Sequence, residues 1–195
     1  MRRLNKSAHF VFLDVKNVVY VHRRSLDTHI FWRKQLNGGR VMLQNALLIV
    51  DLQPEFVTDE KTRAAYQRVL KFVKEANSYD MIIATAFVRG NPNYKRLLNY
   101  NFPERPAPLE FAYDRLIPKT GYGLTDMQYI NFSRNYHYDI VGCETDACIL
   151  KIAMDLFDRE YSFSVLYPQV FTSADIPDKV LRTLLKRNLG DAVKF

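Results

Sequence analysis

The chain has 195 residues, and 48% of them are hydrophobic, which is enough for one globular domain with a sizeable core. No apolar run approaches the roughly 18–20 residues that a membrane-spanning helix needs. The apolar stretch at residues 10–21 is interrupted by charged residues, and no small-residue cleavage site of a secretory signal follows it. The only cysteines, Cys143 and Cys148, argue against a disulfide framework and favour a reducing, cytoplasmic location.

The net charge of +7 lies in the first 41 residues, which hold nine basic and two acidic side chains. The other 154 residues hold 19 basic and 19 acidic side chains and are therefore neutral. A neutral domain lacks the electrostatic signature of a nucleic-acid-binding surface. We therefore expect neither nucleic acid nor a membrane as a partner of residues 42–195.

Three interpretations of residues 1–41 are open. They form a basic arm for nucleic acid or an acidic membrane, they add an edge strand at residues 10–21, or they are not part of the working protein. We favour the third, with Met42 as the true start, because Gly38-Gly39 can be encoded by a ribosome-binding sequence just before Met42. An intact mass of 22.9 kDa for protein made from the native gene would contradict it. The predicted domains are thus a basic extension, 1–41, and a hydrolase domain, 42–195.

Strands and helices alternate from Met42 onward. Short apolar runs such as ALLIV predict buried strands, and apolar residues at helical spacing predict the helices between them. The expected elements are strands at 46–50, 81–86, 115–117, 138–143, 162–167 and 192–195, and helices at 62–77, within 121–136, at 145–160 and at 177–188, with a proline-rich loop over 89–119. This alternation predicts a three-layer α/β/α fold with a mainly parallel, doubly wound sheet.

Three reactive side chains follow three of these strands. Asp51 ends the first strand, Lys119 follows the strand at 115–117, and Cys148 comes just after the strand at 138–143. Ligands bind at the carboxyl edge of such sheets, so we expect the three side chains to converge there.

This set can form a cysteine nucleophile. A helix start near Thr145 or Asp146 and a cation at Lys119 are expected to lower the pKa of Cys148, and Asp51 can act as the base. Backbone N–H groups around Glu144 and Cys148 can form an oxyanion hole.

The segments ALLIVDLQPEF, IPKTGYG and VGCETDACIL, in this order, resemble the isochorismatase-like cysteine hydrolases, which include nicotinamidases and N-carbamoylsarcosine and ureidoacrylate amidohydrolases. The resemblance runs from about residue 43 to the C-terminus. It implies a catalytic triad of Asp51, Lys119 and Cys148 and an oxyanion hole from the backbone amides of Glu144 and Cys148. It further implies a cis peptide between Cys143 and Glu144, a substrate-stacking role for Phe56, and a homo-oligomer.

The sequence also departs from this family. Its nicotinamidases carry an Asp-x-His metal-binding motif after the second strand, where this chain has Thr85-Ala-Phe-Val-Arg-Gly90. We therefore expect no metal and no cofactor, and doubt a standard nicotinamidase activity. Gly121-Tyr122-Gly123 replaces a serine-containing stretch and makes Tyr122 a candidate substrate contact. Isochorismatases proper generally lack the nucleophilic cysteine, so Cys148 favours cleavage of a C–N bond.

The sequence thus predicts a cysteine hydrolase that cleaves a small amide, carbamoyl or ureido substrate through a thioester. Cys143 lacks C-x-x-C spacing and is interpreted as structural. The alternatives are a catalytically silent scaffold with this fold and a nicotinamidase with a degenerate metal site. A flavodoxin-like or nucleotide-binding protein is disfavoured, because no glycine-rich phosphate loop follows the first strand.

Overall fold

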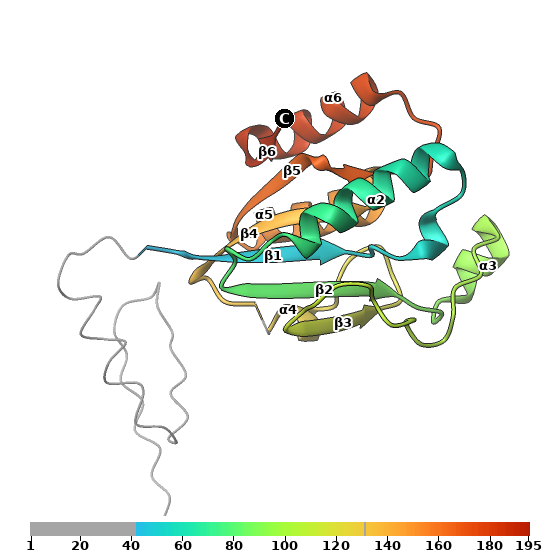
Figure 1. Cartoon of the computed structure of the whole chain (residues 1–195), viewed down its shortest axis with the longest axis horizontal. Coiled ribbons are helices and arrows are strands. Elements are labelled where there is room, and N and C mark those ends of the chain that lie inside the picture. Colours follow the sequence, from blue (N-terminus) through green and yellow to red (C-terminus); the bar gives the residue numbers. More distant parts are fainter. Residues whose placement is uncertain (1–41, 131) are drawn as a thin grey trace, which may run out of the picture. The chain divides into compact units, whose positions relative to one another are not determined.

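The structure is a computed structural model that describes residues 42–130 and 132–195 (Figure 1). The interpretations of residues 1–41 concern a segment outside the described residues. The boundary placed at Met42 also stays a prediction. In the described part of the chain, no helix is both long enough and apolar enough to cross a membrane.

A six-stranded sheet forms the middle layer of the fold, with the strand order β3-β2-β1-β4-β5-β6. Every neighbouring pair of strands is parallel, which confirms the predicted sheet type. The strands are β1 (Gln44–Val50), β2 (Met81–Phe87), β3 (Arg115–Lys119), β4 (Tyr136–Cys143), β5 (Ser162–Phe171) and β6 (Val193–Lys194).

The chain runs from β1 outward to β2 and β3, then returns to the middle for β4 and continues the other way. Because parallel crossovers are right-handed, connections leading in opposite directions place their helices on opposite faces of the sheet. Figure 1 shows α2 in front of the sheet and α5 behind it. The helices and helical turns are η1 (Pro54–Phe56), α2 (Glu60–Lys74), α3 (Pro92–Leu98), α4 (Asp126–Tyr129), η2 (Thr145–Ile149), α5 (Leu150–Asp158), α6 (Asp178–Leu189) and η3 (Gly190–Ala192).

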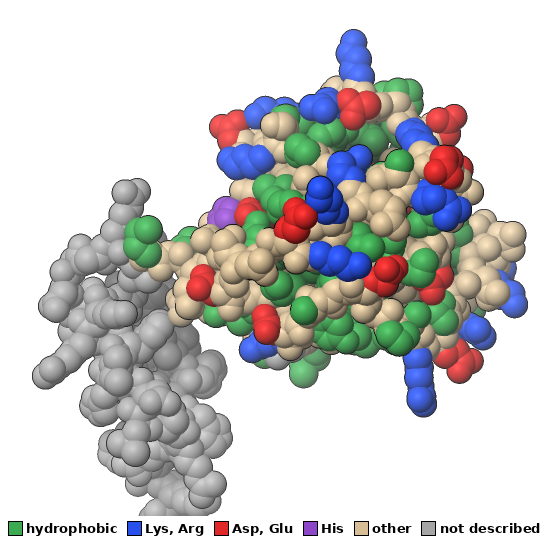
Figure 2. Space-filling view, viewed as in Figure 1, with side chains coloured by type: hydrophobic (Ala, Val, Ile, Leu, Met, Phe, Trp, Pro, Cys, Tyr) green, Lys and Arg blue, Asp and Glu red, His purple; other side chains and the backbone are tan. Residues whose placement is uncertain are grey.

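Local sequence signals explain where two of the helices start. The Asp59 side chain accepts a hydrogen bond from the Thr62 amide at 2.7 Å, and Thr62 caps Asp59 in return, so α2 starts with a capping box. Asn91 caps α3, and Pro92 occupies its first turn, where the missing N–H costs nothing. The core lies where α2 and α5 cover the sheet, and residues 46–50 of β1 have no exposed surface. Figure 2 shows charges of both signs spread over one face of the molecule.

Gly142 brings the ends of β1 and β4 close together. It pairs with Val50 and has a φ of 116°, and a Cβ there would lie 2.1 Å from the Val50 carbonyl oxygen. Only glycine can occupy this position without a clash. The close approach matters because Asp51 follows Val50 and Cys143 follows Gly142.

The structure differs from the expected elements mainly in four places. The strand expected at 115–117 continues to Lys119, so Lys119 ends this strand instead of following it. The proline-rich loop contains α3, which the prolines concealed because Pro92 starts the helix rather than preventing it. The helix expected at 145–160 begins with the π-helical turn η2 before it continues as α5. Strand β5 runs to Phe171, four residues beyond the predicted end, because the pairing register between β4 and β5 shifts there.

Candidate active site

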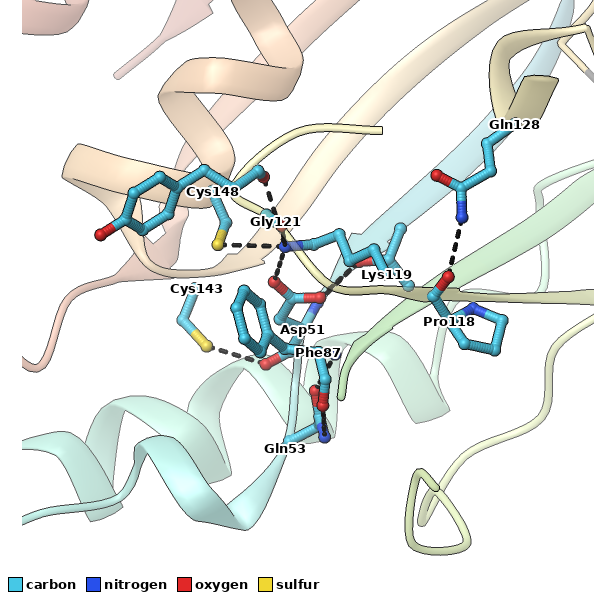
Figure 3. Close-up of polar contacts among 11 residues, drawn as sticks. Asp51, Gln53, Phe87, Pro118, Lys119, Gly121, Gln128, Cys143 and Cys148 are labelled. Atoms are coloured by element: carbon cyan, nitrogen blue, oxygen red, sulfur yellow. Dashed lines mark hydrogen bonds and ion pairs between the residues drawn. The ribbon is translucent and has the colours of Figure 1, made fainter. Parts of the chain in front are cut away.

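Asp51 directly follows β1, and hydrogen bonds fix both its backbone and its side chain (Figure 3). Its φ of 47° lies in the left-handed region, which turns the chain sharply at the strand end. The Thr85 hydroxyl accepts a hydrogen bond from the Asp51 amide at 3.1 Å and donates one to Asp51 Oδ1 at 2.7 Å. The Asp51 carbonyl accepts from the Gln53 amide at 2.8 Å and from Cys143 Sγ at 2.9 Å. These bonds fix the carboxylate without using Oδ2.

Gln53 ties the end of β1 to the end of β2. Its side-chain nitrogen donates a hydrogen bond to the Phe87 carbonyl at 3.2 Å, and its side-chain oxygen accepts one from the Phe87 amide at 2.5 Å. The buried side chain therefore continues the hydrogen-bond ladder beyond the last paired residues of the two strands. Both Gln53 and Thr85 escaped the sequence analysis. The available signals were Thr85 as the one polar residue in MIIATAF and Gln53 two positions after the candidate acid.

Lys119 is the last residue of β3, and its ammonium group joins the other two predicted residues. Nζ lies 2.6 Å from Asp51 Oδ2 and 3.2 Å from Cys148 Sγ. It also donates to the carbonyl oxygens of Gly121 at 2.8 Å and Tyr122 at 3.2 Å. Burial favours the neutral amine, but the charge of Asp51 and the hydrogen bonds to Asp51 and Cys148 outweigh it and raise the pKa of Lys119. Lys119 therefore stays protonated.

Cys148 lies in η2 and is 2% exposed. The expectation of a lowered pKa is wrong for the site without substrate. Burial raises the pKa of Cys148 well above 9.0, and the Asp51 charge raises it further. Lys119 lowers the pKa, as the sequence suggested, but the opposing effects are larger. The resting site therefore holds a neutral thiol beside an Asp51–Lys119 ion pair.

The peptide bond between Cys143 and Glu144 is cis, as the family resemblance implied. It joins the end of β4 to η2, so it lies between the strand and the turn that carries Cys148. Cys143 is fully buried, and burial raises the pKa of its thiol well above the usual value. The oxyanion-hole role of the Glu144 and Cys148 amides stays a prediction.

Aromatic rings gather beside these residues. Phe87 lies under the Lys119 ammonium, 4.6 Å from ring centroid to Nζ. Phe56, 6% exposed, packs against Phe102 with the ring centroids 5.2 Å apart. Tyr122, 40% exposed, meets Tyr94 edge-on at 5.2 Å. A cavity of about 460 Å³ adjoins this cluster, and its lining includes four rings and three basic side chains: Phe87, Tyr94, Tyr100, Phe102, Arg89, Lys95 and Arg96. The structure thus places Tyr122 as an accessible ring and Phe56 as a buried one.

The residues present do not fit the metal site of the family's nicotinamidases. Within residues 42–130 and 132–195, no three His, Cys, Asp or Glu side chains gather closely enough to hold a metal ion. Thr85, the first residue of the segment that replaces the metal motif, is occupied by its two hydrogen bonds to Asp51. We therefore derive no step through a metal, and the expected absence of a cofactor stays a prediction.

Comparison with known proteins places the fold but not the activity. No protein-family model matches the chain, and no curated protein matches it in sequence. Among solved structures, the nicotinamidase from Bacillus subtilis is 14% identical, with a TM-score of 0.59 and coverage of 78% of this chain and 100% of that one. The nicotinamidase from Staphylococcus aureus is 22% identical, with a TM-score of 0.53 and coverage of 76% and 96%. An isochorismatase-like hydrolase from Alkaliphilus metalliredigens is 15% identical, with a TM-score of 0.53 and coverage of 77% and 93%.

The chain has the three-layer α/β/α fold of these nicotinamidases and isochorismatase-like hydrolases, which confirms the predicted fold class. The resemblance drawn from the three sequence segments is therefore confirmed at the level of the fold. At such low identity the likeness does not extend to substrate or mechanism, which must be argued from the site.

Proposed function

We propose that this chain is a cysteine hydrolase that cleaves the C–N bond of a small amide, carbamoyl or ureido compound through a thioester. The observation that carries the proposal is the contact of Asp51 and Cys148 with one buried ammonium group, that of Lys119. Asp51 directly follows β1, Lys119 ends β3, and Cys148 lies in the turn after β4, at the edge where ligands of such sheets bind. Nicotinamidases and hydrolases among the proteins of similar fold support the same class of reaction.

The first half of the reaction moves one proton from sulfur to carboxylate and then to the leaving nitrogen. The Cys148 thiol gives its proton to Asp51 as sulfur attacks the substrate carbonyl carbon, and the carbonyl π electrons move to oxygen. The Glu144 and Cys148 amides are the proposed donors to that oxyanion. When the intermediate collapses, the C–N bond breaks, the protonated Asp51 gives its proton to the nitrogen, and the acyl group stays on Cys148 as a thioester.

The second half returns the site to its starting state. Asp51 takes a proton from water while the water oxygen attacks the thioester carbon. The C–S bond then breaks, the sulfur regains the proton, and the carboxylic or carbamic acid leaves. Lys119 keeps its proton throughout and stabilises whichever of Asp51 and Cys148 carries the negative charge. A neutral resting thiol suits this scheme, because Asp51 needs a proton to receive.

A screen for ammonia or amine release from nicotinamide, carbamoyl and ureido compounds tests the proposal. We expect Cys148→Ala to abolish turnover of any substrate found, while its circular dichroism spectrum and unfolding midpoint stay close to those of the parent. Cys143→Ser is the matched control, because it also removes one buried thiol of the same region but keeps a donor for the Asp51 carbonyl, and it should keep most activity. Full activity of Cys148→Ala across the panel would contradict the mechanism.

A further inference from the structure

A second cavity, of about 580 Å³, lies between α2, the second half of β5 and α6. Its lining includes none of Asp51, Lys119 and Cys148, so it is a different cavity from the candidate active site. Strand β6 pairs only with residues 165–166 of β5, and the part of β5 beyond them forms one wall of the cavity. The proposed hydrolase chemistry assigns no role to this space.

Helix α2 supplies a second wall. Lys61, Ala64, Ala65 and Arg68 line the cavity at the spacing i, i+3, i+4, i+7, which places side chains on one face of a helix. The two alanines lie between the two basic residues, and their short side chains leave the space that longer ones would fill. This face of α2 is therefore a hollow with a basic residue at each end.

Two arginines approach consecutive residues of β5 from different helices. Arg68 of α2 donates a hydrogen bond from Nε to the Pro168 carbonyl at 2.9 Å. The guanidinium carbon of Arg182, in α6, lies 4.3 Å from the centroid of the Tyr167 ring. Because residues 167 and 168 are neighbours, the two guanidinium groups lie beside the same part of the cavity wall. The carboxylate of Asp178, also in the lining, is held by Arg182 Nε and by the Tyr167 hydroxyl, both at 2.6 Å.

The charged side chains of the lining leave an excess of positive charge. Lys61, Arg68 and Arg182 stand against Asp178, which gives a net charge of +2. Lys61 makes no hydrogen bond or ion pair with any residue in the described part of the chain. Arg182 makes its hydrogen bond to Asp178 through Nε alone, so its other N–H groups are free to donate. Such donors bind a carboxylate or a similar anion strongly.

Thr145 adds a buried polar atom to the same cavity. It lines the cavity and is 1% exposed, and its hydroxyl makes no hydrogen bond within residues 42–130 and 132–195. A buried hydroxyl without a partner is costly, so it favours a ligand with a polar atom. Thr172, another lining residue, lies 2.8 Å from Glu144 Oε2 and 2.5 Å from Asp146 Oδ1. Carboxyl groups therefore lie near Thr172, and we place the anionic group of a ligand at the arginines.

We propose that this cavity binds a small organic anion with an apolar body, held by Lys61, Arg68 and Arg182. Apolar side chains of α2, β5 and α6 make up much of the rest of the lining, and an apolar body covers them. A small hydrophilic anion would leave these side chains in contact with water, and a cation would be repelled. The proposal is independent of the proposed function, because none of these residues takes part in the proposed chemistry.

Titration calorimetry with 2-naphthoate tests the proposal on the full chain. The neutral ligand 2-naphthylmethanol carries the same rings without the charge and is the matched comparison. We expect 2-naphthoate to bind at least about tenfold more tightly than 2-naphthylmethanol. This preference should fall when the salt concentration is raised. Equal affinities of the two ligands, or no binding of 2-naphthoate, would overturn the proposal.

A substitution that fills the hollow locates the binding. Ala64→Phe adds a ring at an exposed position of α2 inside the cavity lining and changes no charge. We expect it to weaken the binding of 2-naphthoate at least about tenfold. Gln67→Phe is the matched control, because it puts the same ring at an exposed position of α2 outside the lining. A folded Ala64→Phe variant with the parental affinity would place the binding elsewhere and overturn the proposal.

Charge-removing variants test the basic residues. Lys61→Gln removes a charge that has no partner among the described residues, so it should fold, and it should weaken 2-naphthoate at least about threefold. Arg68→Gln should weaken it more, because a guanidinium group donates two hydrogen bonds to one carboxylate. Both variants should leave the affinity for 2-naphthylmethanol unchanged. Lys71→Gln, exposed on α2 outside the lining, should alter neither ligand. Parental affinity for 2-naphthoate in both Lys61→Gln and Arg68→Gln would overturn the anion site and leave the hydrolase proposal untouched.

Discussion

Replacing Lys119 by Met removes the charge that joins Asp51 to Cys148 while keeping a long apolar side chain over Phe87. The side chains of Lys119 and Asp51 are 1% and 0% exposed, and the charged atoms lie 2.6 Å apart. At an effective dielectric constant of about 20, that separation corresponds to about 6 kcal/mol of attraction. The desolvation of both ions offsets part of it, so we expect Lys119→Met to lower the free energy of unfolding by about 3–5 kcal/mol.

A double-mutant cycle measures the interaction free energy between Asp51 and Lys119. Asp51→Asn keeps a side-chain oxygen for Thr85, and the double variant Asp51→Asn/Lys119→Met leaves no unpaired charge. We expect the double variant to be more stable than Lys119→Met alone, with a coupling free energy of about 3 kcal/mol from urea unfolding. A Lys119→Met variant within about 1 kcal/mol of the parent, or a double variant as unstable as the two losses added together, would refute the buried ion pair.

Two further predictions follow from the same site. Thr85→Val removes both hydrogen bonds to Asp51 at nearly constant volume and should cost about 2–4 kcal/mol of unfolding free energy and most of the activity, whereas Thr85→Ser should keep the activity. A Thr85→Val variant with parental stability would show that those bonds contribute nothing. Because the pKa of Cys148 is raised, its thiol stays protonated at neutral pH, and its alkylation by iodoacetamide should still be rising as the pH passes 9.0. A plateau below pH 8 would mean that Lys119 outweighs burial.

Asp51 and Cys148 could be predicted because each follows a strand that the apolar pattern marks clearly. Buried parallel strands are short apolar runs, so their carboxyl ends, and the reactive residues there, are visible in the sequence. Gln53 could not be assigned a role, because its bonds go to the backbone of Phe87 in another strand. Helix α3 was hidden for a local reason, since a proline at the first turn is equally common in loops.

The charge state of Cys148 was beyond sequence reasoning for a different reason. Its neighbours Lys119 and Asp51 were both foreseen, and the sequence suggests that the cation would dominate. The sign of the effect depends on burial and on the balance between the two charges, and both are properties of the folded site. Because Cys148 is 2% exposed and lies beside a carboxylate that is already paired, the neutral thiol is favoured.

The neutral thiol of Cys148 is the proposed nucleophile, the carboxylate of Asp51 is the proposed base, and the ammonium of Lys119 contacts both of them. Asp51 is held by Thr85, Gln53 and Cys143 at atoms other than Oδ2, so Oδ2 alone faces the ammonium group. That arrangement keeps the base in place when the proton moves, and Lys119 contacts both ends of the transfer.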